Sequence, residues 1–208
     1  MLVNLREKRW RISLHGWPKM SDRGNDKLSN HLIWIDLEMT GLNPEKEVIL
    51  EIATIITDDR LEIVAEGPNI SINYPEEMLQ TMDEWNSAHH KESGLLDRVT
   101  TSPYDCQMAE KETLEFISRH CKKGESLLCG NSIWQDRRFL IKHMPGLEKF
   151  FHYRMIDVTS IKELVKRWYP SLPPYEKKKD HLALSDIKES ISELKYYRQK
   201  IFRPGFPD

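Results

Sequence analysis

The sequence predicts an α/β protein in which a mixed β-sheet is flanked by α-helices. Three strand-like runs occupy residues 32–72, and only short polar connections separate the second from the third. Such spacing is typical of an antiparallel meander. After residue 75, helical patterns alternate with short apolar strands, which a sheet with helices on its faces would satisfy. At 208 residues, the chain is expected to form one domain with a sizeable core.

The first thirty residues differ from the rest. Residues 1–20 are basic and lack the apolar stretch of a secretory signal, and residues 21–30 are polar. We predict a poorly ordered N-terminal extension over 1–30 and a folded domain over 31–208. Two alternatives stay open: a mitochondrial presequence, and translation that starts at Met20.

The expected strands are rich in β-branched and aromatic residues, and they span residues 32–37, 48–57 and 62–72. Glu51 lies inside the second run, where a lone acid either supports a metal site from behind or faces a sheet edge. Periodicity, proline and glycine then predict helices over 75–88, 109–121, 132–143, 160–169 and 184–202, with short strands at 126–129 and 155–158.

Two carboxylates stand one residue apart at the end of the first strand. Residues i and i+2 of a strand point to the same face, so Asp36 and Glu38 should project together. Adjacent acids repel each other and are costly to desolvate, and a hard divalent cation relieves both costs. The same pair also occurs on ordinary solvated surfaces, so the interpretation needs further acids on other elements.

Those further acids are present. Asp136 and Asp186 each fall near the start of a predicted helix, and His181 lies in the loop before the last helix. Each alone has an ordinary explanation, because acids favour helix N-termini and loop histidines are usually solvated. Together, four acids and a histidine at the ends of elements could bind two metals and supply a base.

Composition narrows the class of protein. The net charge of −2 gives no global basic field, so a nucleic-acid ligand would have to be short or gripped locally. The three cysteines are scattered, which favours a reducing cytoplasm over a disulfide framework or zinc site. No apolar run approaches membrane-spanning length, so no membrane association is expected.

At this point the sequence resembles a known family. The D-x-E pair, the central aspartate and the late H-x-x-x-x-D match the DEDD exonucleases of the histidine subgroup. The stretches WIDLEMTGL, EIAT, GNSI-x-QDRRFL, HYR-x-x-DV and HLAL-x-DI-x-ES are similar to the members that degrade very short RNA. The resemblance spans about residues 31–202 and makes 31–208 an exonuclease domain.

The resemblance implies a ribonuclease H-like fold, a homodimer, and hydrolysis of single-stranded RNA from the 3′ end. Dinucleotides would be the main substrate and 5′-mononucleotides the product. It also implies residue roles. Asp36, Glu38, Asp136 and Asp186 would hold two Mg²⁺ or Mn²⁺ ions, and His181 would deprotonate the attacking water. Substrate contacts would come from Leu42, Trp85, His90, Ser132, Tyr153, Arg154 and Thr159, with Tyr153 donated by the second subunit.

The sequence departs from the family at two places, and rival functions exist. Trp134 stands where glycine is expected, close to Ser132, and the lysines at 177–179 either attract phosphate or are merely solvated. A proofreading-type DNA exonuclease would use the same four acids. A nucleic-acid-binding module without activity would usually have lost one of them. Turnover of a dinucleotide against a long oligomer separates these possibilities.

Overall fold

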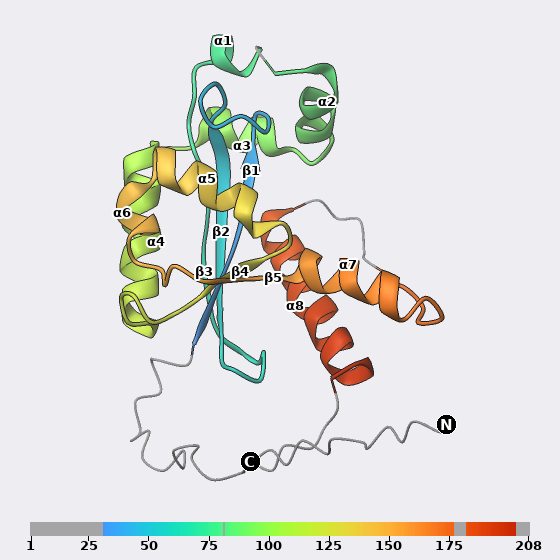
Figure 1. Cartoon of the computed structure of the whole chain (residues 1–208). Helices are drawn as coiled ribbons and strands as arrows, with labels where there is room; N and C mark the ends of the chain where they lie inside the picture. Colours follow the sequence, from blue (N-terminus) through green and yellow to red (C-terminus); the bar gives the residue numbers. More distant parts are fainter. Residues whose placement is uncertain (1–30, 81, 177–181, 203–208) are drawn as a thin grey trace, which may run out of the picture.

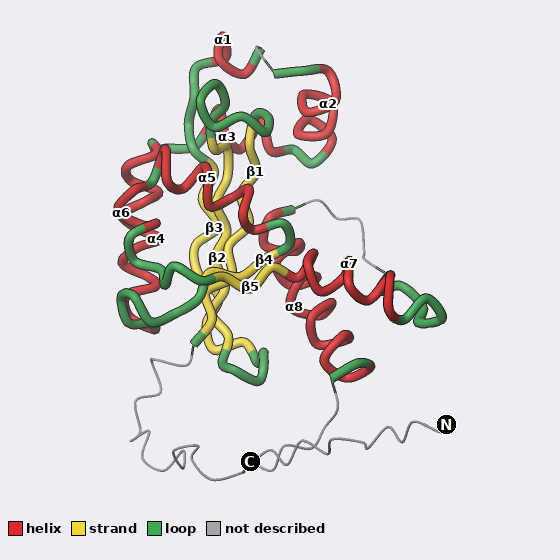
Figure 2. The backbone as a smooth tube through the Cα atoms, in the orientation of Figure 1, coloured by secondary structure: helices red, strands yellow, loops and turns green. Residues whose placement is uncertain are grey.

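The computed structural model describes residues 31–80, 82–176 and 182–202. A five-stranded sheet with the order β3-β2-β1-β4-β5 runs through the molecule (Figures 1 and 2). The meander is formed by β1 (Leu32–Met39), β2 (Ile49–Thr57) and β3 (Ile63–Ser71), which pair antiparallel. The short strand β4 (Leu128–Gly130) pairs parallel with β1, and β5 (Met155–Asp157) pairs parallel with β4. The predicted mixed sheet is therefore confirmed.

Helices cover both faces of the sheet and one of its ends. On one face lie α4 (Cys106–His120), α5 (Ile133–His143) and α6 (Pro145–Glu148), and on the other lie α7 (Val158–Trp168) and α8 (Ala183–Lys200) (Figure 1). The short helices α1 (Glu76–Leu79), α2 (Glu84–Glu92) and α3 (Leu95–Thr101) sit together at one end, beyond β1 and β2.

Alternate side chains of β1 point to opposite faces of the sheet and pack into two separate hydrophobic clusters. Ile33, Ile35 and Leu37 pack with the α4–α5 side, whereas Trp34 packs with the α7–α8 side. Asp36 continues the Trp34 row, so its side chain points toward α8. The strand is central and nearly buried, and this fixes the direction of its two acids.

Close packing of β4 against β1 requires a glycine. A Cβ atom on Gly130 would lie 3.0 Å from the carbonyl oxygen of Ile35 and 2.9 Å from Cδ1 of Ile133. The chain then turns sharply at Ser132, whose φ of 51° is left-handed, before α5 begins. This turn brings the start of α5 to the same edge as the acids of β1.

One predicted helix is wrong. The segment expected as a single helix over 75–88 contains two, because α1 ends at Leu79 and α2 begins after Asp83. The Asp83 carboxylate accepts a 2.9 Å hydrogen bond from the amide of Asn86 and so caps a new helix. Helix α3, after Gly94, and the short helix α6 were not predicted. The remaining elements agree with the prediction to within a few residues, and the predicted N-terminal extension lies outside the described residues.

Candidate active site

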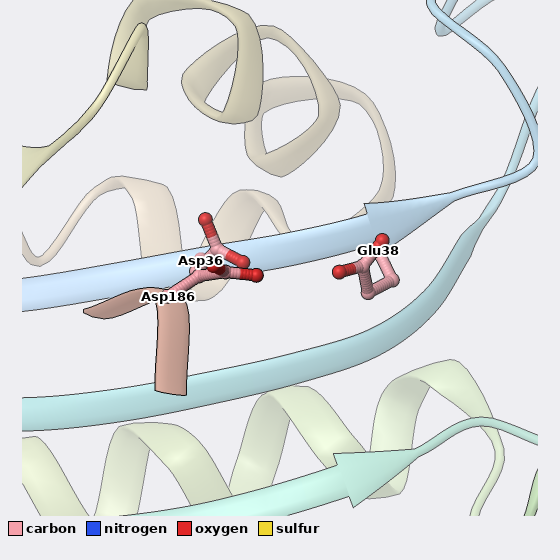
Figure 3. Close-up of side chains that lie close together, drawn as sticks. All are labelled: Asp36, Glu38 and Asp186. Atoms are coloured by element: carbon pink, nitrogen blue, oxygen red, sulfur yellow. The ribbon is translucent and has the colours of Figure 1, made fainter. Parts of the chain in front are cut away.

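Three carboxylates converge at the carboxyl end of β1. Asp36 and Glu38 project from the strand, and Asp186 projects from the first turn of α8 (Figure 3). One oxygen of each can be chosen so that all three atoms lie within 4.8 Å of one another, and all three residues are half-buried. Residues 150 positions apart in the chain thus form one acidic cluster.

The fourth acid, Asp136, stands directly behind this cluster. It belongs to α5, is 6% exposed, and its Oδ1 accepts a 3.0 Å hydrogen bond from the backbone amide of Leu37. Leu37 lies between the two acids of β1. Asp136 is therefore held against the strand, although it is not part of the three-residue cluster.

Burial and mutual repulsion destabilise the ionised form of these carboxylates. The pKa of Glu38 is raised from 4.5 to about 8, mainly by burial and next by the neighbouring charge of Asp186. Glu51 and Asp136 act in the same direction, and Arg98 opposes them weakly. Burial also raises the pKa of Asp136, against the hydrogen bond from Leu37. Each shift reports that a negative charge here lacks compensation.

This donor set fits a hard divalent cation. Carboxylate oxygens are the ligands that Mg²⁺ and Mn²⁺ prefer, and converging acids with raised pKa values would be stabilised by positive charge. Asp36, Glu38 and Asp186 are placed to hold such an ion, with Asp136 next to them. Among the residues that the structure describes, the cluster contains carboxylates alone, which suits a hard cation better than a soft one.

A buried ion pair supports the cluster from the next strand. Glu51 of β2 lies opposite Glu38 in the strand register and is 1% exposed. Arg98 binds its carboxylate through Nε at 3.3 Å and Nη2 at 3.4 Å, and Ser71 donates to it at 3.0 Å. Because β2 is flanked by strands on both sides, Glu51 does not face an edge. It stands behind the cluster.

His90 lies against the cluster from α2. The side chain is buried, and Nε2 is 2.9 Å from the carbonyl oxygen of Met39. A carbonyl only accepts, so Nε2 carries the proton. The other nitrogen, Nδ1, then faces Oε2 of Glu38 at 3.9 Å, and burial holds the pKa of His90 below its ordinary value. Its neutral ring thus lies between the end of β1 and a carboxylate of the cluster.

Two large apolar side chains are exposed beside the cluster. Leu42, just after β1, is 71% exposed, and Trp85, in the first turn of α2, is 72% exposed. The Trp85 ring stacks on His89 with centroids 5.1 Å apart and planes at 8°. The Leu42 carbonyl accepts a 2.6 Å hydrogen bond from Gln135 of α5. The backbone of Leu42 and the ring of Trp85 are thus held by neighbours, while both side chains remain exposed.

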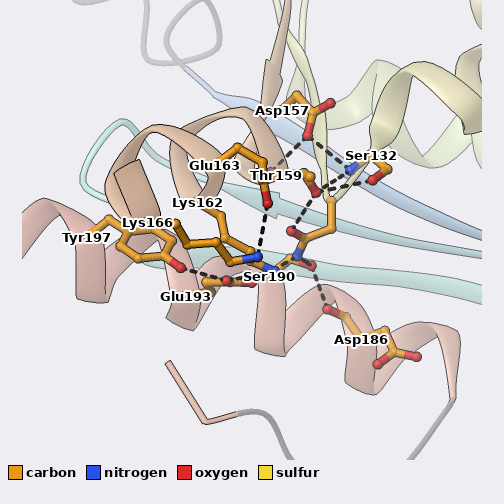
Figure 4. A network of polar contacts seen from close by, with 11 residues as sticks. Ser132, Asp157, Thr159, Lys162, Glu163, Lys166, Asp186, Ser190, Glu193 and Tyr197 are labelled. Atoms are coloured by element: carbon orange, nitrogen blue, oxygen red, sulfur yellow. Dashed lines mark hydrogen bonds and ion pairs between the residues drawn. The ribbon is translucent and has the colours of Figure 1, made fainter. Parts of the chain in front are cut away.

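A polar pair lies on the other side of the cluster, where β4 and β5 end. The amide of Ser132 donates to Oδ1 of Asp157 at 3.0 Å and to Oγ1 of Thr159 at 2.9 Å (Figure 4). The hydroxyls of Ser132 and Thr159 are 3.2 Å apart. Asp157 also accepts from the amide of Thr159 and so caps α7. The structure thus brings together Ser132 and Thr159, two of the predicted substrate contacts.

Tyr153 and Arg154 lie apart from Ser132 and Thr159. They precede β5, whereas Thr159 follows it, so the two pairs lie at opposite ends of that strand. Tyr153 is 70% exposed, and the guanidinium carbon of Arg154 lies 5.3 Å from the centre of its ring. Arg137 fixes this segment, donating to the Tyr153 carbonyl at 2.7 Å. His181 and the lysines at 177–179 lie outside the described residues.

Comparisons with known proteins place this geometry in a family. An exonuclease family model, RNase T, matches residues 33–194. The oligoribonuclease of Shewanella loihica is 56% identical over 174 residues, which cover 83% of this chain and 96% of that protein. The oligoribonuclease of Aliivibrio fischeri is 58% identical over 173 residues, with the same coverage.

The chain belongs to the oligoribonuclease family.

The family fold is seen again in solved structures. E. coli exonuclease I in complex with a dT13 oligonucleotide aligns with a TM-score of 0.63 at 11% identity, covering 82% of this chain and 41% of that one. The zinc ion bound form of the exonuclease I–ssDNA complex aligns with a TM-score of 0.65 at 11% identity, covering 84% and 41%. The chain thus spans about two fifths of these larger proteins. The shared fold is the ribonuclease H-like architecture.

Sequence reasoning missed several residues that hold the oligoribonuclease-type site in shape. The sequence motifs contain both Asp157 and Asn131 but predict no role for either. Arg98 carried no signal at all, since a lone arginine in a helix is usually solvated. The D-V pair after a short strand, typical of a helix cap, could have revealed Asp157.

Proposed function

We propose that this protein hydrolyses very short single-stranded RNA from the 3′ end, with dinucleotides as the main substrate and 5′-mononucleotides as the product. The convergence of Asp36, Glu38 and Asp186, in a chain of the oligoribonuclease family, is the observation that carries the proposal. The exposed Trp85 on one side and the Ser132–Thr159 pair on the other provide contacts for the two ends of a short substrate.

The metal centre consists of two Mg²⁺ or Mn²⁺ ions held by the four acids of the sequence motif, including Asp136. The family and the raised pKa of Glu38 support dependence on a divalent metal, and oxygen-only ligands support these two ions. When bound, the cations supply positive charge that stabilises the phosphodiester as it gains charge in the transition state. Asp136 keeps the strand in place through the amide of Leu37.

His181 acts as the general base. It lies five residues before Asp186 in the sequence and two residues before α8 begins, which supports a place close to the acidic cluster. A neutral imidazole with an ordinary pKa near ~6.5 can accept the proton of the attacking water around neutral pH.

The bases of the substrate are held by Leu42 and Trp85. A tryptophan face stacks on any base, and such a contact contributes about 1–3 kcal/mol. Leu42 stands next to it as a wedge between the two bases. His90 approaches the 3′ nucleotide from the same helix as Trp85, and its ring also steadies Glu38. These contacts do not depend on the identity of the bases, so short RNA of any base sequence can be degraded.

The 5′ phosphate is held by Ser132, Thr159 and Arg154, which we call the phosphate cap. The strand register supports a second subunit as the source of Tyr153. Ile33 is level with Met155 across the sheet, so Tyr153 lies about five residues, or roughly 16 Å, behind Asp36 along the strands. A homodimer that brings Tyr153 of the partner subunit to the cluster would carry Arg154 of the partner subunit with it.

We place this activity in the cytoplasm. Cys106, Cys121 and Cys129 are all free thiols, as expected in a reducing compartment. Within the described parts of the chain, no helix combines the length and apolar character needed to cross a membrane. The exonuclease domain over 31–208, preceded by an N-terminal extension, remains a prediction.

The decisive experiment compares substrates of different length and sugar. The purified protein is given Mg²⁺ and 5′-phosphorylated RNA dinucleotide, RNA pentanucleotide, a long RNA, or the corresponding DNA. We expect fastest turnover of the RNA dinucleotide, no turnover with EDTA, and none in the isosteric variant Asp36→Asn. Preference for long DNA would instead identify a proofreading-type exonuclease. Binding without turnover would identify a non-enzymatic module.

A further inference from the structure

Two functional groups of the site are built on separate segments. Ser132 stands before α5 and Thr159 begins α7, whereas Asp186 belongs to α8. A dinucleotide held by its 5′ phosphate must present its single phosphodiester to Asp186 and its neighbours. The distance between the cap and the metal centre therefore has to be fixed, because a displacement of about 1 Å can cost a hundredfold in rate.

Asn131 connects these segments directly. Its Oδ1 accepts a hydrogen bond from Oγ1 of Thr159 at 3.2 Å. Its Nδ2 donates to Oγ of Ser190 at 2.7 Å and to Oε2 of Glu193 at 3.3 Å, both on α8. Ser190 in turn donates to the carbonyl of Asp186 at 2.8 Å. A continuous chain of hydrogen bonds thus leads from the cap to the residue that carries a metal ligand (Figure 4).

The chemistry of the partners determines the direction of each bond. A carboxylate only accepts, so the amide nitrogen of Asn131 must face Glu193 and its oxygen must face Thr159. The single hydrogen of Thr159 is then used by Asn131. The hydroxyl of Ser132, 3.2 Å away, is the one that can turn toward a phosphate. Within this arrangement Thr159 contributes to the phosphate cap by orienting Ser132, and Asn131 orients Thr159.

Glu193 gives the connection a rigid base on α8. It is 1% exposed, and its carboxylate pairs with Nζ of Lys162 and accepts from the hydroxyl of Tyr197, each at 2.9 Å. Lys162 belongs to α7, so Glu193 also ties the helix of Thr159 to the helix of Asp186. Ser190 is 4% exposed. Buried groups with several partners have little freedom to rearrange, so the spacing they set is well defined.

We propose that Asn131 is a positioning residue that fixes the spacing between the phosphate cap and the metal centre, and thereby makes turnover sensitive to the 5′ phosphate of a dinucleotide. This inference rests on the proposed function. Asn131 touches neither substrate nor metal ligand side chain. It acts through Thr159 on one side and through Ser190 and Glu193 on the other.

The test measures kcat/KM for a dinucleotide with a 5′ phosphate and for the same dinucleotide with a 5′ hydroxyl. The ratio of the two kcat/KM values reports how well the phosphate cap positions the scissile phosphodiester at the metal centre. In Asn131→Ala we expect this ratio to fall about tenfold, the effect of one or two ordinary hydrogen bonds, with the loss in kcat rather than KM. The 5′-hydroxyl substrate, which does not use the cap, should be turned over nearly as before.

A smaller change tests the link to α8 even if Asn131→Ala folds poorly. Ser190→Ala removes one hydroxyl and should lower the same ratio about threefold or more. Ser118→Ala is the matched control, because Ser118 also donates to the carbonyl four residues earlier, at 2.7 Å, but on the exposed side of α4. Its ratio should equal that of the wild type.

The outcomes separate the inference from the function on which it rests. A wild-type protein that does not cleave dinucleotides refutes the proposed function. A wild type that cleaves both dinucleotides equally refutes the cap, and the inference with it. If the wild type prefers the phosphate but both variants keep that preference, or lose the same factor on both substrates, Asn131 is only structural and the inference is wrong.

Discussion

The backbone amide of Leu37 and the carboxylate of Asp136 are joined by a 3.0 Å hydrogen bond that links the first strand to α5. Leu37 is the residue between Asp36 and Glu38, so this bond fixes the position of Asp136 relative to the two acids of β1. Asp136 therefore has two roles: it accepts a hydrogen bond from the backbone, and it supplies a negative charge to the site. The two can be separated by substitution.

Asp136→Asn keeps an oxygen acceptor for the Leu37 amide and removes the charge. We expect activity to be lost while the free energy of unfolding changes little or rises, because burial already disfavours the ionised acid. Asp136→Ala also orphans the buried amide and should cost about 1–3 kcal/mol of stability. Turnover and urea unfolding of both variants check this. Full activity in Asp136→Asn would show that the charge is dispensable.

Glu38 makes stability and metal binding depend on pH. Its pKa is raised from 4.5 to about 8, so the folded state holds the proton more tightly than the unfolded chain does. The stabilisation from this proton is complete below about pH 4.5 and is lost as the pH rises through 8. Mg²⁺ competes with the proton, and we expect Mg²⁺ to raise the unfolding temperature more near pH 8 than near pH 6.

Calorimetric titration with Mg²⁺ in buffers of different ionisation enthalpy should detect proton release at neutral pH. The variant Glu38→Gln serves as the control, since it has no proton to release at this position. Equal stabilisation by Mg²⁺ at both pH values, together with no proton release, would contradict the raised pKa.

Trp85 is expected to hold a base by stacking. Trp85→Ala should raise KM for the dinucleotide by about five- to a hundredfold, in line with the free energy of one base stack. Trp168, 67% exposed at the end of α7, provides a matched control, and Trp168→Ala should leave KM unchanged. A value of KM unaffected by Trp85→Ala would assign the base contact to another side chain.

His181 is expected to act on the chemical step. His181→Ala should lower kcat by a factor of about 10²–10⁴ and leave binding of the dinucleotide nearly intact. His181→Asn, which retains hydrogen bonding but not basicity, should not restore the rate. Single-turnover kinetics with a separate binding measurement distinguishes the two steps. A variant that binds poorly but turns over normally would make His181 a substrate contact.

The contribution of Tyr153 across a dimer can be tested by complementation. Tyr153→Ala and Asp186→Ala should each be nearly inactive alone. When the two chains are co-expressed, the heterodimer contains one site with an intact Asp186 and an intact Tyr153 of the partner subunit. About a quarter of the wild-type activity should then return. No recovery, in a sample that sedimentation shows to be dimeric, would mean that Tyr153 acts within its own chain.

The fold was largely predictable because its signals are local. The alternation of β1 and the β-branched content of β2 follow from side-chain packing on a sheet, and both strands agree with the prediction. The region around α1, α2 and α3 was not predicted well. These helices are short, and the break at Asp83 depends on a cap that competes with an otherwise continuous helical pattern.

The acidic residues of the site could be predicted from the sequence, but the residues that support them could not. Asp36 and Glu38 share a strand face by simple periodicity, whereas bringing Asp186 to them needed the resemblance, because α8 lies at the far end of the chain. The supports could not be found this way. The value of Asn131 or Arg98 comes from partners on other elements, and single-sequence periodicity holds no information on such pairs.

The cluster also has a consequence for biosynthesis, because its members come from the first strand and the last helix that the structure describes. While the ribosome is still making the chain, Asp36 emerges long before Asp186, and no partial chain holds all the ligands. A growing polypeptide therefore has no competent centre beside the messenger that encodes it. Cleavage ability arises only once α8 docks, late in translation or after release.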